Sequence, residues 1–246
     1  MKVRGWITGA AALVVGAFAA GGAAQPTRAR PAVAPPPSEP VVIELFTAQG
    51  CAGCPDANRA VEAVAAEPGV IALTYAVDYW DYLGWSDTFA RPEFAARQQT
   101  YRQALKLRAL PTPQVIVDGA RQSQARPEPL QAAITAEIGR RAAPPEIEFR
   151  QSGDAVGVGS GRPPAGGAEV WAVVFVPGPQ EVEVARGDNR GQTVRHVNVV
   201  RRLTRLGDWT GRPALFRLPA EREEGEAVAV LVQAKADRRI LTAAVG

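Results

Sequence analysis

The 246-residue sequence has very few of the nitrogen and sulfur side chains that bind zinc and copper: one histidine, one methionine and two cysteines. A structural zinc site needs four ligands drawn mainly from cysteine and histidine, and this chain does not supply them. The single histidine, His196, has no partner visible in the sequence, so a catalytic triad built on it has no support. Two thiolates still suffice for Cu(I), which prefers soft ligands, so a Cu(I) carrier stays an open alternative.

The sequence also lacks a strong excess of one charge, with 28 Lys and Arg against 25 Asp and Glu. Part of the +3 net charge comes from Lys2 and Arg4, and both halves of the remaining chain are close to neutral. Proteins that neutralise nucleic-acid phosphates need a basic surface. Nucleic acid is therefore not an expected partner.

Long apolar runs are missing beyond the first residues of the chain. Two basic residues precede the apolar run 6–20, and small residues follow it. This pattern predicts a secretory signal peptide at residues 1–24, cleaved after Ala23 or Ala24. The run is shorter than the ~20 residues that span a bilayer, so we expect no stable membrane anchor after cleavage. The mature protein is expected to be periplasmic or secreted, with residues 25–40 as a disordered, Pro- and Ala-rich leader.

The two cysteines lie in the sequence Cys51-Ala52-Gly53-Cys54, shortly after the apolar run 41–46. The β-branched run predicts a buried strand, and Pro55 suits the first turn of a helix. At such a junction the first sulfur lies near the positive end of the helix dipole, which favours thiolate over thiol. We therefore expect Cys51 to be the exposed nucleophile and Cys54 to be the shielded, resolving cysteine.

A structural disulfide is the main alternative for this pair. In the chain-entropy model a loop this short contributes roughly 2 kcal/mol, against more than about 4 kcal/mol for a loop of a hundred residues. Such a bridge contributes little to stability, so a redox pair is the preferred interpretation.

The remaining periodicity of the first half predicts strand, helix, strand, helix, Pro turn, hairpin and helix, which is the thioredoxin layout. The expected ranges are strand 41–46, helix 56–67, strand 70–77, helix 91–107, a hairpin arm at 115–117 with a turn at Asp118-Gly119, and helix 128–141.

The segment 78–85 follows the second strand, at the sheet edge where open α/β sheets bind ligands. One interpretation is an aromatic, acidic wall beside the cysteines, with Asp78, Trp80 and Asp81 contacting substrate. The alternative is that its rings pack the following helix onto the sheet.

Glu44 is the one charged residue in the first apolar strand. Burial would raise the pKa of this carboxylate, which would then take the proton of Cys54 as a general base when that thiol attacks a mixed disulfide. The alternative is an edge position with Glu44 in water.

The pattern changes near residues 142–145, where Ala-Ala-Pro-Pro marks a predicted boundary. Alternating runs beyond it predict an antiparallel sandwich or small barrel. We therefore expect a thioredoxin-like α/β domain at 41–143 and a β-rich domain at 144–246. The predicted strands of the second half are 147–150, 155–158, 170–176, 181–186, 193–202, 214–218 and 227–233.

Several motifs together resemble the secreted thioredoxin-like family catalogued as domain of unknown function 1223. They are Glu44-Leu45-Phe46-Thr47, Gln49-Gly50-Cys51, Cys54-Pro55, the segment 77–85, Thr112-Pro113-Gln114, the run 186–191 and Asn198-Val199-Val200-Arg201. The resemblance covers most of the mature chain and implies a fold and a redox-type motif, with no substrate. The wider similarity to thioredoxin implies that Pro113 is a cis-proline facing the disulfide and that the Thr112 backbone pairs with a bound peptide. Ala52-Gly53 departs from the Gly-Pro usual in thioredoxin, and the aromatic segment lengthens the distance to the proline. The resemblance therefore does not extend to thioredoxin's substrates.

Together these features predict a periplasmic thiol-disulfide oxidoreductase that needs no cofactor and exchanges electrons with a protein thiol or disulfide. Two other classes stay open: a non-enzymatic binding module with a structural or vestigial disulfide, and the Cu(I) carrier.

Overall fold

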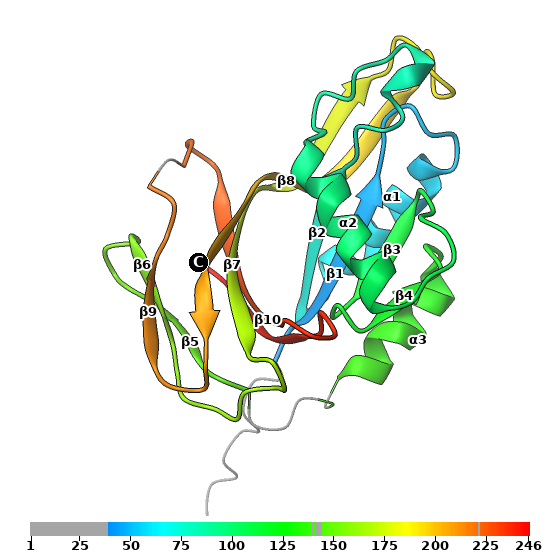
Figure 1. Ribbon diagram of the computed structural model, residues 1–246. Helices are drawn as coiled ribbons and strands as arrows, with labels where there is room; N and C mark the ends of the chain where they lie inside the picture. Colours follow the sequence, from blue (N-terminus) through cyan, green and yellow to red (C-terminus); the bar gives the residue numbers. More distant parts are fainter. Residues whose placement is uncertain (1–38, 139, 141–143, 221) are drawn as a thin grey trace, which may run out of the picture. The chain divides into compact units, whose positions relative to one another are not determined.

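The computed structural model describes residues 39–138, 140, 144–220 and 222–246, all of which belong to one compact unit. The expected signal peptide and nearly all of the expected leader lie outside the described residues. No helix in the described part of the chain combines the length and apolarity needed to cross a bilayer. The elements follow one another in this order (Figure 1): β1 (Val41–Thr47), α1 (Cys54–Ala65), β2 (Val70–Ala76), the 3-10 helix η1 (Asp81–Leu83), α2 (Pro92–Ala104), β3 (Gln114–Val117), β4 (Arg121–Ser123), α3 (Pro127–Glu137), β5 (Ile147–Phe149), β6 (Ala155–Val158), β7 (Ala168–Glu183), β8 (Thr193–Trp209), β9 (Ala214–Arg217), β10 (Ala227–Ala234) and β11 (Ile240–Val245).

The first half contains the βαβ unit that the sequence predicts. β1 and β2 pair in parallel with α1 between them in sequence. β3 pairs antiparallel with β1, and β4 pairs antiparallel with β3. The turn after β3 begins with Asp118 and Gly119, whose φ angles are 49° and 63°. Gly119 also touches the backbone of Arg238 so closely that a Cβ would overlap it, so this position requires glycine.

Alternation along β1 divides the side chains of the first half between two faces. Val41, Ile43 and Leu45 lie in a buried cluster with residues of α1 and α3. Val42 and Phe46 point the other way, into a cluster that includes residues of α2. Helices therefore cover both faces of this part of the sheet, as expected for a strand that is buried at every position.

The larger sheet runs across the predicted domain boundary. Its strand order is β11-β10-β7-β8-β2-β1-β3-β4, so strands of both halves share one sheet (Figure 1). The join is a parallel pairing of Thr74 in β2 with Val199 in β8, and the Thr74 hydroxyl donates to the Val197 carbonyl at 2.5 Å. The predicted division into separate domains at 41–143 and 144–246 is therefore corrected: the second half extends the sheet of the first.

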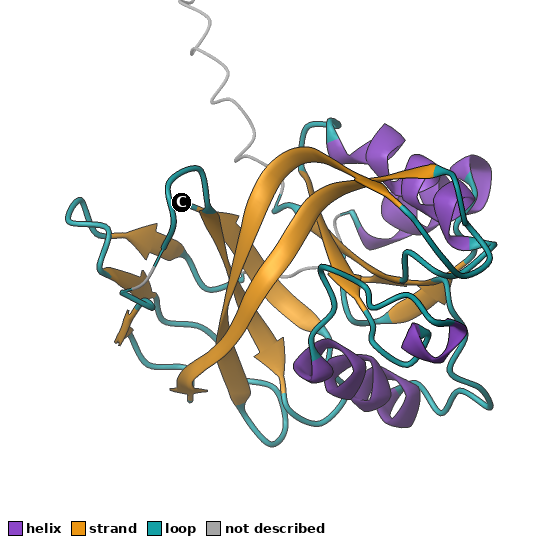
Figure 2. Ribbon diagram, turned by 90° about the horizontal axis from the view of Figure 1, so that it is seen from above, coloured by secondary structure: helices purple, strands orange, loops and turns teal. Residues whose placement is uncertain are grey.

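Two long strands, β7 and β8, make this extension possible. They form an antiparallel hairpin and are strongly bent (Figure 2). Their register shifts between Val176 and Pro179, where Gly178 has a φ of 80° and donates its N–H to Asn198 Oδ1 at 2.9 Å. Asn198 Nδ2 in turn donates to the carbonyl of Ala72 in β2 at 2.9 Å. One asparagine thus accommodates the irregularity in β7 and fastens the hairpin to the first half.

The antiparallel part of the second half resembles the predicted sandwich. A smaller sheet, with strand order β5-β6-β9, shares a buried cluster with one face of β7 and β10. Val170, Val174 and Trp209 contribute to this cluster from the larger sheet, and Val156 and Phe216 contribute from the smaller. The last strand, β11, was not among the predicted runs.

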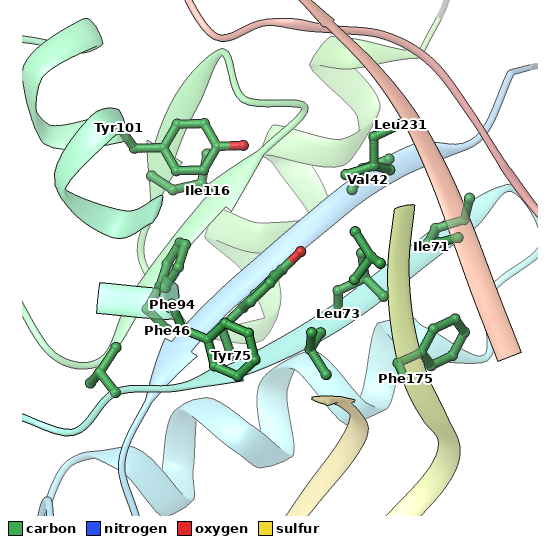
Figure 3. Packing of buried hydrophobic residues seen from close by; sticks show 14 of the residues in the cluster. Val42, Phe46, Ile71, Leu73, Tyr75, Phe94, Tyr101, Ile116, Phe175 and Leu231 are labelled. Atoms are coloured by element: carbon green, nitrogen blue, oxygen red, sulfur yellow. The ribbon is translucent and has the colours of Figure 1, made fainter. Parts of the chain in front are cut away.

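The opposite face of β7 and β10 belongs to the same core as the first half. Phe175 and Leu231 lie in one cluster with Val42, Phe46 and Tyr75 (Figure 3). The Phe46 ring stacks on that of Tyr75 with centroids 5.3 Å apart. Burial of these side chains couples the two halves energetically.

A protease site inserted between residues 143 and 144 should therefore yield a nicked protein that stays together. The shared sheet and core predict a single peak on size-exclusion chromatography and a single thermal transition. Two separating fragments, each with its own transition, would instead restore the original two-domain prediction.

Candidate functional site

The two cysteines lie at the amino-terminal end of α1 and form a disulfide, with their Cα atoms 5.4 Å apart. Cys54 is the first residue of the helix, and its N–H donates to the Cys51 carbonyl at 3.1 Å. Among the described residues, no side chain caps this helix end, whose N-cap residue is Gly53. The positive end of the helix dipole therefore lies at the start of α1, where the disulfide forms.

The expectation that Cys51 is exposed is wrong for this disulfide form. Cys51 is 2% exposed and Cys54 is fully buried, whereas Ala52 and Gly53 between them are exposed. Part of the cover comes from the Thr112 carbonyl oxygen, which lies 3.7 Å from Cys51 Sγ.

Thr112 and Pro113 lie beside the disulfide, as the resemblance implies. The peptide bond between them is cis, and a Cβ on Gly53 would be 3.6 Å from Pro113 Cδ. The Thr112 hydroxyl contacts Tyr79 Oη at 2.5 Å, and Tyr79 also donates to Gln98 Oε1 at 2.8 Å. Partial burial raises the pKa of Tyr79. The role of Thr112 and Pro113 in binding a substrate stays a prediction.

The predicted aromatic wall has both packed and exposed members. Trp80 packs against the main core and stacks on Tyr82, which is 78% exposed. The Asp81 carboxylate accepts hydrogen bonds from Ser86 Oγ and from the Asp87 N–H at 3.1 Å, so it stabilises its own segment. Asp78 is half-buried at the start of this segment. Contact of Asp78, Trp80 and Asp81 with a substrate stays a prediction.

Gln49 and Asp87 link the aromatic segment to the turn that carries Cys51. The Gln49 N–H donates to Asp87 Oδ2 at 2.7 Å, and the Gln49 amide oxygen accepts from Trp85 Nε1 at 2.8 Å. Burial raises the pKa of Asp87 to about 6. The motif Gln49-Gly50-Cys51 contributed to the family resemblance, but nothing local in the sequence identifies its partners.

A second contact with this turn comes from the tip of the β7–β8 hairpin. Asn189 Nδ2 donates to the carbonyl oxygens of Gln49 and Cys51, each at 2.8 Å. The Asp188 N–H donates to the Gly50 carbonyl at 3.2 Å. The run 186–191 contributed to the family resemblance, but nothing local in the sequence identifies this contact, because its partners lie 138 residues apart.

Glu44 is fully buried, but its partners do not suit the predicted general base. Arg97 Nε donates to Glu44 Oε1 at 2.6 Å, and the Tyr101 hydroxyl donates to Glu44 Oε2. Burial alone would lower the pKa of Arg97, and the Glu44 carboxylate raises it above its ordinary value. Since both carboxylate oxygens are held by residues of α2, the geometry favours a structural ion pair over proton transfer with Cys54.

The described residues contain no group of three or more His, Cys, Asp or Glu side chains that is placed to hold a metal ion. The two sulfurs are held in the disulfide.

Comparison with curated proteins gave no match. Among solved structures, protein AGR_C_4864 from Agrobacterium tumefaciens is 30% identical over 83% of this chain and 92% of that chain, with a TM-score of 0.69. HBP35 of Porphyromonas gingivalis is 17% identical over 85% of this chain and 75% of that chain; its TM-score of 0.56 indicates a similar fold alone. A family model described as "Protein of unknown function (DUF1223)" matches residues 42–233. The chain therefore belongs to this family.

Proposed function

We propose that this protein is a thiol-disulfide oxidoreductase with a thioredoxin-like site, in which Cys51 and Cys54 are the reactive pair. One observation carries the proposal: Cys51 Sγ lies 3.7 Å from the Thr112 carbonyl, beside an uncapped helix end. Helix N–H groups favour a thiolate over a thiol. A polypeptide bound along Thr112 would bring its own sulfur close to Cys51.

The exchange that this pair supports is balanced in two steps. The Cys51 thiolate attacks a substrate disulfide, so a Cys51–substrate bond forms while the substrate S–S bond breaks and releases one thiolate. Cys54, as thiolate, then attacks the Cys51 sulfur, forms the internal disulfide and releases the second substrate sulfur. Two electrons pass to the substrate, and two protons convert its sulfurs to thiols. The reverse sequence oxidises a substrate dithiol.

A purely structural role for the disulfide has less support. Closing so short a loop contributes roughly 2 kcal/mol in the chain-entropy model. Hydrogen bonds with Asp87, Asp188 and Asn189 already hold the turn that carries Cys51. The bridge therefore adds little that the surrounding contacts do not provide.

We also propose that the site works in an oxidising compartment. The amino-terminal sequence pattern supports export, which places the protein in the periplasm or outside the cell. The partner would be a protein thiol or disulfide in that compartment.

Cysteine substitutions in the exported, full-length protein test this function. Cys54→Ser should trap Cys51 in a mixed disulfide with its partner, because the resolving thiol is absent. Mass spectrometry of adducts that disappear on reduction would identify the partner. Cys51→Ser is the matched control and should trap far fewer adducts.

The division of roles between the cysteines would be reversed if Cys51→Ser trapped adducts and Cys54→Ser did not. If neither variant trapped a partner and the reduced wild-type protein failed to reduce a model disulfide, the oxidoreductase proposal would be wrong. The non-enzymatic binding module would then be the better interpretation.

A further inference from the structure

The turn that carries Cys51 receives three hydrogen bonds from one distant loop. This loop, residues 184–192 at the tip of the β7–β8 hairpin, donates to the consecutive carbonyls of Gln49, Gly50 and Cys51. Asn189 supplies two of the three bonds from one side-chain amide and is 2% exposed. A buried amide nitrogen that donates to two carbonyl oxygens, each at 2.8 Å, has a defined position.

The hairpin is itself fastened to the helix that begins at the disulfide. Asn58, one turn after Cys54 in α1, donates from Nδ2 to the Arg195 carbonyl at 2.9 Å. The Arg195 guanidinium contacts Glu62 of α1 and Glu181 of β7, each at 2.8 Å. The hairpin therefore contacts both α1 and the turn before it. Together these contacts fix the position of Asn189 relative to the start of α1.

The electrostatic effect of these donors depends on the charge of Cys51. Carbonyl oxygens carry the negative ends of peptide dipoles, so the oxygens of residues 49 and 51 oppose a negative charge on the neighbouring sulfur. The Asn189 amide hydrogens compensate those oxygens. A thiolate occurs only after the disulfide is reduced, so this compensation favours the reduced form over the disulfide.

We infer that Asn189 is a positioning residue for the dithiol, which holds the Cys51 turn and shifts the redox equilibrium toward the reduced form. The inference rests on the proposed oxidoreductase function and gives the β7–β8 hairpin a role in it. The second half of the chain then supplies part of the redox site as well as part of the sheet.

The test compares Asn189→Ala and Asn189→Asp with the wild-type protein in glutathione buffers. Both variants should lower the equilibrium constant for reduction of the Cys51–Cys54 disulfide, by about tenfold for alanine, which is about 30 mV for a two-electron couple. Aspartate should have the larger effect, because it places a negative charge against the same carbonyls. The phosphine-reduced alanine variant should also react about threefold more slowly with iodoacetamide at neutral pH. Gln192→Ala, which removes an exposed amide from the same tip, should match the wild type.

Circular dichroism of both redox forms would verify that the compared proteins are folded. A variant with lower thermal stability but an unchanged equilibrium constant and alkylation rate would show that Asn189 is only structural and would overturn the inference. A shift toward easier reduction would overturn it as well. Failure of the proposed function is a different result: the wild-type dithiol would then not reduce a model disulfide, whatever Asn189 does.

Discussion

Arg97→Met should lower the free energy of unfolding by about 3 to 5 kcal/mol, the usual cost of leaving one member of a buried ion pair without its partner. The Arg97 and Glu44 side chains are 2% and 0% exposed, and their closest atoms are 2.6 Å apart. Arg97 also lies 5.3 Å from the ring centre of Tyr101 and 5.7 Å from that of Trp171. The substitution keeps most of the side-chain volume but leaves the Glu44 carboxylate buried without its cationic partner.

A double variant separates charge from packing in this experiment. Glu44→Leu combined with Arg97→Met removes both charges and should recover most of the lost stability, since well-packed apolar pairs often replace buried ion pairs at little cost. Arg102→Met, at a more accessible position of the same helix, should change stability by less than about 0.5 kcal/mol. Urea unfolding followed by circular dichroism measures all three. A double variant as unstable as Arg97→Met would show that the unpaired Glu44 carboxylate does not cause the loss of stability.

Between pH 4 and 6.5, Asp87→Asn and His196→Gln should change the pH dependence of stability in opposite directions. Burial raises the pKa of Asp87 from 3.8 to about 6, so the folded protein binds the extra proton and this group's contribution to stability falls as pH rises. Burial lowers the pKa of His196 from 6.5 to about 4, so the unfolded chain binds the extra proton and the contribution rises with pH. Each effect is at most about 3 kcal/mol, and in the wild type they largely cancel.

Each substitution should therefore leave the pH dependence of stability that the other residue causes. Relative to the wild type, Asp87→Asn should lose stability as the pH is lowered from 6.5 to 4, because the His196 effect is no longer opposed. His196→Gln should gain stability over the same interval. Urea midpoints at several pH values measure both differences. Parallel pH curves for the two variants and the wild type would exclude these titrations as the cause.

The local elements of the first half could be predicted because each has its own signal. The apolar strand at Val41, the Pro55 helix start and the Asp118-Gly119 turn are all readable within a few residues, and the helices end within a few residues of their expected limits. The position of the disulfide at the start of α1 follows from the same signals.

The parts that could not be predicted depend on contacts across the chain. Val-Pro-Gly-Pro at residues 176–179 indicated a break, yet β7 continues through it because Asn198 accepts the Gly178 N–H. Glu44 looked like an unpaired carboxylate because Arg97, its partner, lies on a helix that no local pattern orients toward it. For the same reason, Asn189 was not among the predicted site residues.

The placement of Asn189 also determines when the site can form during synthesis. The bonds from Asn189 to Gln49 and Cys51 join residues 140 and 138 positions apart, and β10, the next neighbour of β7, is translated later still. Contacts so distant in sequence slow folding. A nascent chain that has emerged only as far as α3 thus holds both cysteines in an unfinished turn. Under the export proposed above, this order would favour translocation, because the chain cannot complete its fold before its last strands have been synthesised.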